Sequence, residues 1–276
     1  MAANEFEEHA KRWRVAPGSK VNLDRIDTRS KGGAPGDKLV TGTVVKDLVT
    51  QLGEWQTRLW AEGSRSVLMV LQAMDAGGKD GTIRKVFTGV NPQGVRVASF
   101  KAPTPEELSH DFLWRIHQQA PGHGELGVFN RSHYEDVLIV RVNELVPEPV
   151  WRARYEHIRN FEELLTASGT TVVKFFLHIS PEEQAERLQA RLDDPTKRWK
   201  FEAADLDVRK NWDAYQRAFE DALGETSTHD APWYVIPADR KWYRNWAVLQ
   251  VLLATMARID PQFPPEQEGL EGLTVD

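Results

Sequence analysis

Residues 67–82 read Val-Leu-Met-Val-Leu-Gln-Ala-Met-Asp-Ala-Gly-Gly-Lys-Asp-Gly-Thr. The apolar start has the composition of a buried strand, and it leads into a glycine-rich turn, a lysine and the start of a helix. This order is typical of a phosphate-binding loop, in which backbone N–H groups and a helix N-terminus point at an anion. Measured against the spacing Gly, four residues, Gly-Lys-Ser/Thr, the first glycine is Ala73, the pair is Gly78-Lys79 and the hydroxyl position holds Asp80.

Two carboxylates, Asp75 and Asp80, are the unusual feature of this loop. A carboxylate repels a phosphate chain unless a divalent cation lies between them, and Mg2+ is usually held by one or two carboxylates together with substrate phosphates. The loop therefore predicts a metal-dependent phosphoryl-transfer site. The alternative is a tight connection in which the two aspartates only cap a helix. The joint presence of the strand, both glycine pairs and the lysine argues against that alternative.

The composition narrows the class of protein. The chain has 276 residues, a net charge of −6 and no cysteine. This length fits one large domain, and the acidic balance argues against broad binding to nucleic acid or anionic membranes. Disulfides and thiolate metal sites are excluded. Because the chain has neither a signal-peptide pattern nor an apolar run of about 20 residues, we expect a cytoplasmic protein that meets its partner in a cleft.

Strand and helix patterns alternate along the chain. Strands are predicted from residue 67 into the loop and at 95–100, 126–129, 170–179 and 233–236. Helices are predicted at 43–60, from 79 to the breakers at 89–92, at 104–116 and 152–167, from 180 onward, and at 242–256. This alternation predicts an α/β fold with a mostly parallel five-stranded sheet flanked by helices, and ligands bind such sheets at the carboxyl ends of the strands.

A second candidate cluster, Asn-Arg-Ser-His-Tyr-Glu-Asp at 130–136, follows the third predicted strand. In a nucleotide-type site this strand carries a metal-organising acid at its tip, and here that position is Asn130. An amide adds no charge, so Glu135, Asp136 and the two loop aspartates are alternatives for the ligand, and Asn130 could instead cap a helix. We expect His133 to be a hydrogen-bonding residue rather than a base, because an acceptor phosphate is already anionic near neutral pH.

A third cluster is basic. It comprises Arg187 and the stretch Arg-Leu-Asp-Asp-Pro-Thr-Lys-Arg-Trp-Lys at 191–200. Phosphoryl transfer needs positive charge that closes over the donor and acceptor oxygens, and guanidinium groups can clamp such oxygens with two hydrogen bonds. The segment is therefore predicted to be a basic lid, with a solvated charged helix as the alternative. Its candidate residues are Arg187, Arg191, Lys197 and Lys200.

Three motifs, supported by Asn91-Pro92, resemble those of the polyphosphate kinase 2 family: Met74–Thr82, Phe129–Asp136 and Arg191–Lys200. The resemblance covers about residues 20–260. It implies a P-loop kinase fold similar to thymidylate kinase, with a helical lid, and Mg2+-dependent phosphoryl transfer between inorganic polyphosphate and nucleotides, with Mn2+ as a substitute. The version of the second motif in this chain resembles the subgroup that accepts both AMP and ADP.

Carried over by motif, the resemblance implies roles for individual residues. The catalytic residues are Asp75, Lys79, Asn130, Arg131, Arg187 and Arg191. The phosphate- and nucleotide-binding residues are Ala76, Gly77, Gly78, Asp80, Gly81, Thr82, Lys101, Arg115, Lys197 and Lys200. The metal ligand is Asp75, with Asp80, Glu135 and Asp136 as further candidates. Many members carry Asp at the position of Asn130, which leaves the second ligand open among these.

We accordingly expect an N-terminal arm at 1–45, a P-loop kinase domain at 46–260 with a lid near 185–205, and an extended C-terminal tail at 261–276. The expected partners are inorganic polyphosphate and adenine nucleotides, with guanine nucleotides left open, and further copies of the chain in a homodimer or homotetramer. Nucleic acid and membranes are not expected partners. Two alternatives remain for the function: an ATP-dependent nucleoside monophosphate kinase, and a nucleotide-binding regulatory module without turnover.

Overall fold

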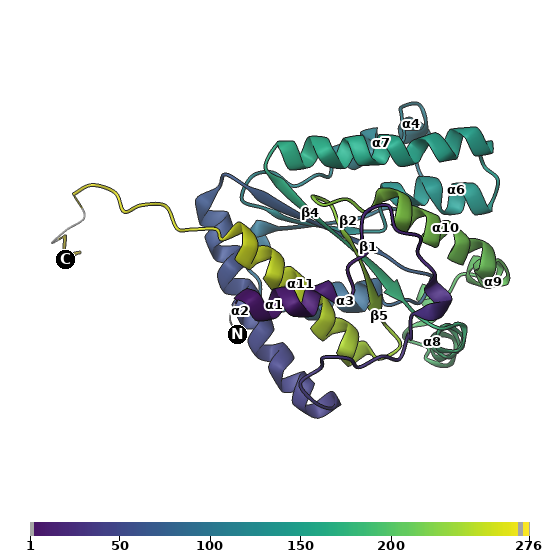
Figure 1. Cartoon of the computed structure of the whole chain (residues 1–276), viewed down its shortest axis with the longest axis horizontal. Coiled ribbons are helices and arrows are strands. Elements are labelled where there is room, and N and C mark those ends of the chain that lie inside the picture. The colour runs from purple at the N-terminus through teal and green to yellow at the C-terminus, as the bar shows by residue number, and fades with distance from the viewer. Residues whose placement is uncertain (1–2, 270–272, 276) are drawn as a thin grey trace.

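A five-stranded sheet forms the centre of the protein (Figure 1) in a computed structural model that describes residues 3–269 and 273–275. The strands are β1 (Ser66–Gln72), β2 (Val95–Ser99), β3 (Leu126–Asn130), β4 (Thr170–His178) and β5 (Trp233–Pro237). Their order is β2-β3-β1-β4-β5, and every neighbouring pair is parallel. The predicted α/β fold with five strands is confirmed, and the sheet is entirely rather than mostly parallel.

Helices connect the strands and cover both faces of the sheet (Figure 1). They are α1 (Ala3–Lys11), α2 (Lys38–Glu62), α3 (Lys79–Val86), α4 (Pro105–Leu108), α5 (Trp114–His117), α6 (Ile139–Val142), α7 (Glu148–Ala167), α8 (Pro181–Asp193), α9 (Ala204–Lys210), α10 (Trp212–Thr226) and α11 (Lys241–Ile259). Short 3-10 helices are η1 (Leu23–Arg25), η2 (Pro92–Gly94), η3 (His133–Val137) and η4 (Arg198–Lys200). Helices α2 and α11 cover one face, with α1 packed on α11, and α7 and α10 cover the other.

Burial explains why the central strands were visible in the sequence. All seven residues of β1 are buried, and eight of the nine in β4 are buried as well. Strands that are covered on both faces read as continuous apolar runs because both sets of alternating side chains enter the core. Since all five strands are parallel, the loops that follow them lie at one edge of the sheet, and this edge carries the candidate site.

Several predicted helices differ from the structure, most clearly those predicted at 43–60 and 104–116. Helix α2 begins at Lys38 instead of residue 43, because Asp37 Oδ1 accepts hydrogen bonds from Leu39 N and Val40 N and so caps the helix five residues earlier. The helix predicted at 104–116 is two short helices, α4 and α5. The capping box at Thr104 is present, but Asp111 Oδ1 accepts a bond from Leu113 N and starts a new turn.

Residues 3–37 lie along helix α11 and the open edge of the sheet. Val15 N donates to Trp233 O at 2.9 Å, and Val235 N donates to Trp13 O at 2.8 Å, so this segment pairs with the outer edge of β5. The Trp13 side chain is buried against α11. The exposed edge that β5 would otherwise present is therefore covered.

The chain after α11 has neither helix nor strand at 261–269 and 273–275. Residues 1–2 of the predicted arm, and 270–272 and 276 of the predicted tail, lie outside the described residues. Within the described part of the chain, every helix is too short or too polar to cross a bilayer.

Candidate active site

The turn between β1 and α3 has the backbone of a phosphate-binding loop. Ala76 and Gly78 have left-handed φ angles of +60° and +103°. A side chain has no room at Gly77, because a Cβ there would lie 2.8 Å from Met74 O. Gly77 N donates to that same oxygen at 3.0 Å and closes the turn. The glycine pair is therefore required by the geometry of the turn, which leads directly into the N-terminus of α3.

Lys79 supplies a positive charge inside the loop. Its Nζ donates to Ala73 O at 3.0 Å, so the side chain folds back along the turn. Burial and the neighbouring Arg131 lower the pKa of Lys79, against the opposite effect of nearby carboxylates such as Asp75. No ion pair joins the amine to a carboxylate within residues 3–269 and 273–275. The loop thus holds a largely buried cation next to backbone groups that favour an anion.

Arg131 lies next to the loop because β1 and β3 are neighbours, with Leu71 opposite Asn130. Its backbone has a left-handed φ of +62°, and its N donates to Leu71 O at 3.1 Å. The guanidinium forms an ion pair with Asp75, with Nη2 to Oδ1 at 2.9 Å. Left-handed backbone at a non-glycine residue is costly and is often kept at functional sites. The strand end therefore aims an arginine at the loop, and Asp75 orients it.

Asn130 and the lid meet at Asp80. The Asn130 amide donates to Asp80 Oδ1 at 2.8 Å, and Lys200 Nζ lies 3.6 Å from Oδ2. These two groups and Lys79 lower the pKa of Asp80, although burial works in the opposite direction. The alternative in which Asn130 caps a helix is wrong, because Ser132 caps η3 by accepting a bond from Tyr134 N.

Arg187 occupies a different place from the one its predicted lid role implied. Its guanidinium is buried, with Nη1 donating to Ala76 O and Gly77 O, both at 3.0 Å, and Nη2 to Ala238 O and Asp239 O at 2.6 and 3.2 Å. Nε donates to a glutamate one turn earlier on α8 at 2.7 Å. All five N–H donors of an arginine are engaged in this way. In this structure Arg187 stabilises the loop by donating to its backbone carbonyls.

The other predicted lid cations, Arg191, Lys197 and Lys200, each contact a different partner. Arg191 Nη1 donates to Lys200 O at 3.2 Å and lies 3.5 Å from Asp205 Oδ2, so it organises the lid itself. Lys197 forms an exposed ion pair with Asp194 at 2.5 Å. Of the four predicted lid cations, Lys200 is the one that forms an ion pair with a loop carboxylate, in the described part of the chain.

The two carboxylates at the end of the second motif, Glu135 and Asp136, have different neighbours. The negative charge of Glu135 acts to raise the pKa of both Lys79 and Arg131, so its carboxylate lies near the loop. Asp136 pairs with Arg154 of α7, with Oδ1 3.0 Å from Nη1. Burial raises the pKa of Asp136 to about 6 in spite of this arginine. Asp136 is therefore engaged in a contact with α7 and not with a loop residue.

Lys101 and Arg115 lie beyond the end of β2. Lys101 is exposed, whereas Arg115 is buried. Arg115 Nη1 donates to Lys101 O at 2.9 Å and lies 3.7 Å from Glu107 Oε2. The structure thus links the two predicted residues through a backbone carbonyl, and Arg115 supports the segment that carries Lys101.

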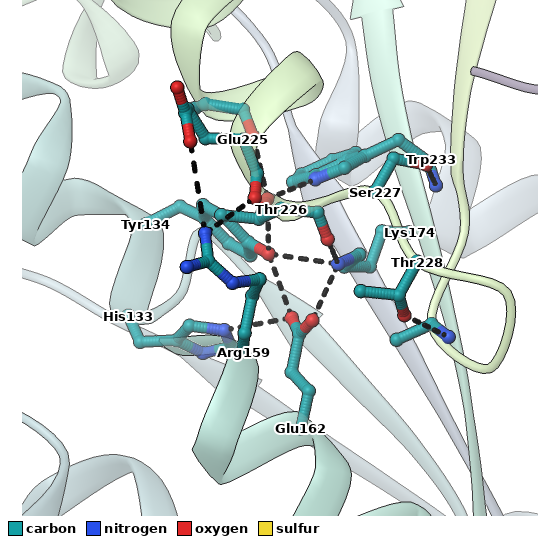
Figure 2. A network of polar contacts seen from close by, with 12 residues as sticks. His133, Tyr134, Arg159, Glu162, Lys174, Glu225, Thr226, Ser227, Thr228 and Trp233 are labelled. Carbon is teal, nitrogen blue, oxygen red and sulfur yellow. Dashed lines mark hydrogen bonds and ion pairs between the residues drawn. The ribbon is translucent and has the colours of Figure 1, made fainter. Parts of the chain in front are cut away.

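A buried polar network holds the second motif from behind (Figure 2). Lys174 Nζ donates to Glu162 Oε2 at 2.5 Å and to Tyr134 Oη at 2.9 Å. Tyr134 Oη in turn donates to Glu162 Oε1 at 2.8 Å, and His133 Nε2 lies 3.2 Å from that same oxygen. Burial lowers the pKa of His133, so the imidazole is neutral at pH 7. His133 is therefore a buried hydrogen-bonding residue, as predicted, and its lack of a base role stays a prediction.

Nearly the whole chain is similar to proteins of one known family. The model of the family described as polyphosphate kinase 2 matches residues 37–264. The chain belongs to the polyphosphate kinase 2 family. It is 54% identical to an AMP/ADP-polyphosphate phosphotransferase of Meiothermus ruber, over 96% of this chain and 100% of that protein. It is 46% identical to an ADP-polyphosphate phosphotransferase of Rhodopseudomonas palustris, over 92% of each.

A solved structure supports the same family. The crystal structure of polyphosphate kinase 2 from Arthrobacter aurescens TC1 matches with a TM-score of 0.91 and 44% identity, over 95% of this chain and 93% of that one. The P-loop kinase fold implied by the resemblance is therefore confirmed.

Two residues of this polyphosphate kinase 2 family chain were missed by the sequence analysis. Tyr215 of α10 lies near Glu135 and Asp75, and burial together with these carboxylates raises its pKa to about 12. Arg244 of α11 is only 3% exposed, and a Cβ built on Gly78 would overlap its Nη1. The sequence signal for Arg244 was its place at the start of the helix after β5, since that start lies at the ligand-binding edge of a parallel sheet.

Proposed function

We propose that this member of the polyphosphate kinase 2 family transfers phosphoryl groups from inorganic polyphosphate to AMP and ADP, forming ADP and ATP in a reversible reaction. One observation carries the proposal: Lys79 of the loop and Arg131, which directly follows β3, lie near each other and beside the loop carboxylates Asp75 and Asp80. The names of the relatives from Meiothermus ruber and Rhodopseudomonas palustris describe the same chemistry, and the first of these names includes both AMP and ADP.

The loop residues would bind the transferring phosphate. The backbone N–H groups at the start of α3 and the Lys79 amine supply positive charge, and Asp75 holds Arg131 before substrate binds. Groups fixed in advance around developing charge lower the barrier most, because they need no rearrangement during the reaction. The acceptor phosphate is anionic near neutral pH, so no side chain has to remove a proton from it. The neutral, buried His133 agrees with this view.

A divalent metal ion fits the carboxylates of the loop. Residues 3–269 and 273–275 contain no group of three or more His, Cys, Asp or Glu side chains that could hold a metal alone. This suits Mg2+, which commonly shares one or two carboxylates with substrate phosphates. Asp75 and Asp80 would be those carboxylates, and the Asn130 amide would orient Asp80. When bound, the ion would neutralise charge on the phosphate oxygens of donor and acceptor.

The segment 185–205 would act as the lid. Lys200 already reaches Asp80, and Arg191 is bonded within the lid. Because Arg187 is anchored to the loop carbonyls, closure would begin beyond it, and the moving part would carry Arg191, Lys197 and Lys200. Excluding water in this way protects the transferring group from hydrolysis.

The test is formation of ATP from long-chain polyphosphate and Mg2+ with AMP or ADP as acceptor, next to a control in which ATP is offered to nucleoside monophosphates. ATP formed with polyphosphate supports the proposal, and ATP formed from AMP as well as ADP supports the broader acceptor range. Turnover only in the control would identify a conventional nucleoside monophosphate kinase. Silence in both assays, with tight nucleotide binding, would identify a regulatory module.

A further inference from the structure

Arg244 lies where the loop and α11 come closest. Helix α11 begins at Lys241, directly after β5 reaches the ligand-binding edge of the sheet. The Arg244 guanidinium fills the space beside Gly78 that a side chain there would need, and its Nη2 lies 3.5 Å from the position of a Cβ on Gly81. A buried arginine therefore stands against the two glycines that flank Lys79.

The charge of Arg244 has no counterion among the residues that the structure describes. The guanidinium is bonded to the amide oxygen of Asn245, which accepts from Nε at 3.1 Å and from Nη2 at 2.8 Å. Among the described residues, no acceptor pairs with Nη1 and no carboxylate forms an ion pair with the guanidinium. Burial and the nearby Arg187 lower the pKa of Arg244 to about 9. A buried charge without a counterion is unfavourable, so an anionic ligand that reaches Arg244 would relieve this cost.

A supporting role for the loop does not explain Arg244. That role belongs to Arg187, which donates to the loop carbonyls of Ala76 and Gly77, whereas no bond joins Arg244 to a loop carbonyl in the described chain. The two arginines lie close enough to repel each other, as the pKa of Arg244 shows. An anion seated in the loop would satisfy the donors left free by Asn245 and would offset this repulsion.

The cations continue beyond Arg244. Burial lowers the pKa of Lys241, one turn earlier on α11, and Arg187, Arg244 and Lys197 lower it further. These like charges therefore lie near one another on the α11 side of the loop, whereas Arg131 and Asn130 approach from the β3 side. A cluster of positive charges suits a ligand with a charge on every phosphate better than it suits the single phosphate of AMP.

We propose that Arg244 binds phosphate oxygens of the polyphosphate donor in the loop, on the side opposite Arg131. This inference rests on the proposed function and adds a donor-binding residue to it. Arg244 would contribute charge-assisted hydrogen bonds from Nη1 to the chain of phosphates, and Lys241 would extend the same cationic surface.

The experiment compares Arg244→Met and Arg244→Lys with Arg258→Met, which removes an exposed arginine from the other end of the same helix. For Arg244→Met we expect the KM for polyphosphate to rise about 10- to 100-fold, the range for loss of a charge-assisted hydrogen bond. The KM for AMP and ADP should change much less. Arg244→Lys should recover part of the loss, and Arg258→Met should resemble the unchanged protein.

A second measurement does not depend on turnover. Tripolyphosphate alone, without nucleotide, should raise the melting temperature of the unchanged protein and of Arg258→Met, and this rise should be much smaller for Arg244→Met. Without ligand, Arg244→Met should melt at or above the temperature of the unchanged protein, because an unpaired buried charge has been removed.

The outcomes separate the two proposals. If the unchanged protein shows no polyphosphate-dependent turnover, the proposed function fails, and the tripolyphosphate melting shift still decides whether Arg244 binds phosphate. If turnover is present and Arg244→Met keeps both its KM for polyphosphate and its melting shift, the inference about Arg244 is overturned alone. A rise in KM for AMP instead would overturn the donor assignment, and a lower melting temperature without ligand, with both KM values raised equally, would indicate a supporting residue.

Discussion

Two groups of buried charges in this protein are built in opposite ways. Behind the second motif, Lys174 and Glu162 pair at 2.5 Å, and Tyr134 and His133 also bond to this carboxylate (Figure 2). At the loop, Lys79 bonds to a carbonyl and lacks an ion pair in the described chain. In the first group, the charges of Lys174 and Glu162 are satisfied by the protein itself. The second leaves positive charge that a ligand can satisfy.

The pKa values report the same contrast. Burial alone would raise the pKa of Glu162, but Lys174 and His133 outweigh it and the pKa is lowered. At the loop the largest effect on Lys79 is burial, and a second cation, Arg131, adds to it. A closed network fixes the position of a segment, whereas an open one stores positive charge for an anionic substrate. This difference, more than burial itself, separates the supporting charges from the candidate catalytic ones.

The largest expected effect is on turnover and concerns Lys79, in the loop whose positive charge is left for a ligand. Replacing Lys79 with alanine should reduce kcat for polyphosphate-dependent ATP formation by about 100-fold or more, because a charge aimed at the transferring phosphate is lost. The melting temperature should stay close to that of the unchanged protein. Lys85→Ala, at an exposed position on the same helix α3, is the matched control. Near-normal kcat in the Lys79→Ala protein would show that this lysine has no catalytic role.

In the buried network around Lys174 and Glu162, the expected effect is on stability. Lys174→Met should lower the free energy of unfolding by about 3–5 kcal/mol, because it leaves Glu162 buried and unpaired. Urea denaturation measures this change, and the exposed Lys210→Met should change it little. The double variant Lys174→Met/Glu162→Gln should lose less than the sum of the single losses. Additive losses would mean that the two side chains do not form the pair described here.

A substitution of Asn130, which bonds to Asp80, tests whether a metal ion binds at the loop. In Asn130→Asp the hydrogen bond to Asp80 is replaced by repulsion between two carboxylates, so the metal-free protein should lose about 1 kcal/mol of stability. Mg2+ should raise the melting temperature of this variant more than that of the unchanged protein. The exposed Asn143→Asp is the control. Equal Mg2+ shifts in all three proteins would argue against a metal at this position.

The last prediction concerns the pH dependence of stability that arises from His133 in the network around Glu162 and Lys174. Because burial lowers the pKa of His133 below its ordinary value of 6.5, the unfolded chain takes up a proton near pH 6.5 and the folded chain does not. The stability from this residue is therefore complete above pH 6.5 and is lost as pH falls below it, by up to about 1.4 kcal/mol per pH unit. His133→Gln should flatten the unfolding free energy between pH 6.5 and 5, while the exposed His123→Gln should not. Identical slopes for both variants would contradict a buried, neutral His133.

Local patterns were enough to find the loop and the sheet, but less reliable for short helices. The strand at 66–72 and the glycine pair at 77–78 follow from burial on both faces and from a turn too tight for side chains. The break between α4 and α5 was missed because the side chain of Asp111 competes with the helix for a backbone N–H. Such competition depends on a single contact and leaves no periodic trace in the sequence.

The roles of the arginines depended on distant parts of the chain. Arg187 was predicted to be a lid residue that reaches the substrate, but it donates to carbonyls after β1 and after β5. Its spacing within α8 could not reveal partners that lie about 50 and 110 residues away. Arg244 was overlooked for the same reason, since its significance comes from Gly78.

The sequence by itself determined the α/β class, the phosphate-binding loop and the family, because these depend on residues that are close together in the chain. Only the tertiary structure decided which charges are satisfied and which are left open. Ion pairs such as Arg131 with Asp75 and Lys174 with Glu162, and the unpaired Arg244, depend on which strands are neighbours in the sheet. Strand order is set by packing across the whole domain, and the free energy of a charge depends on everything around it.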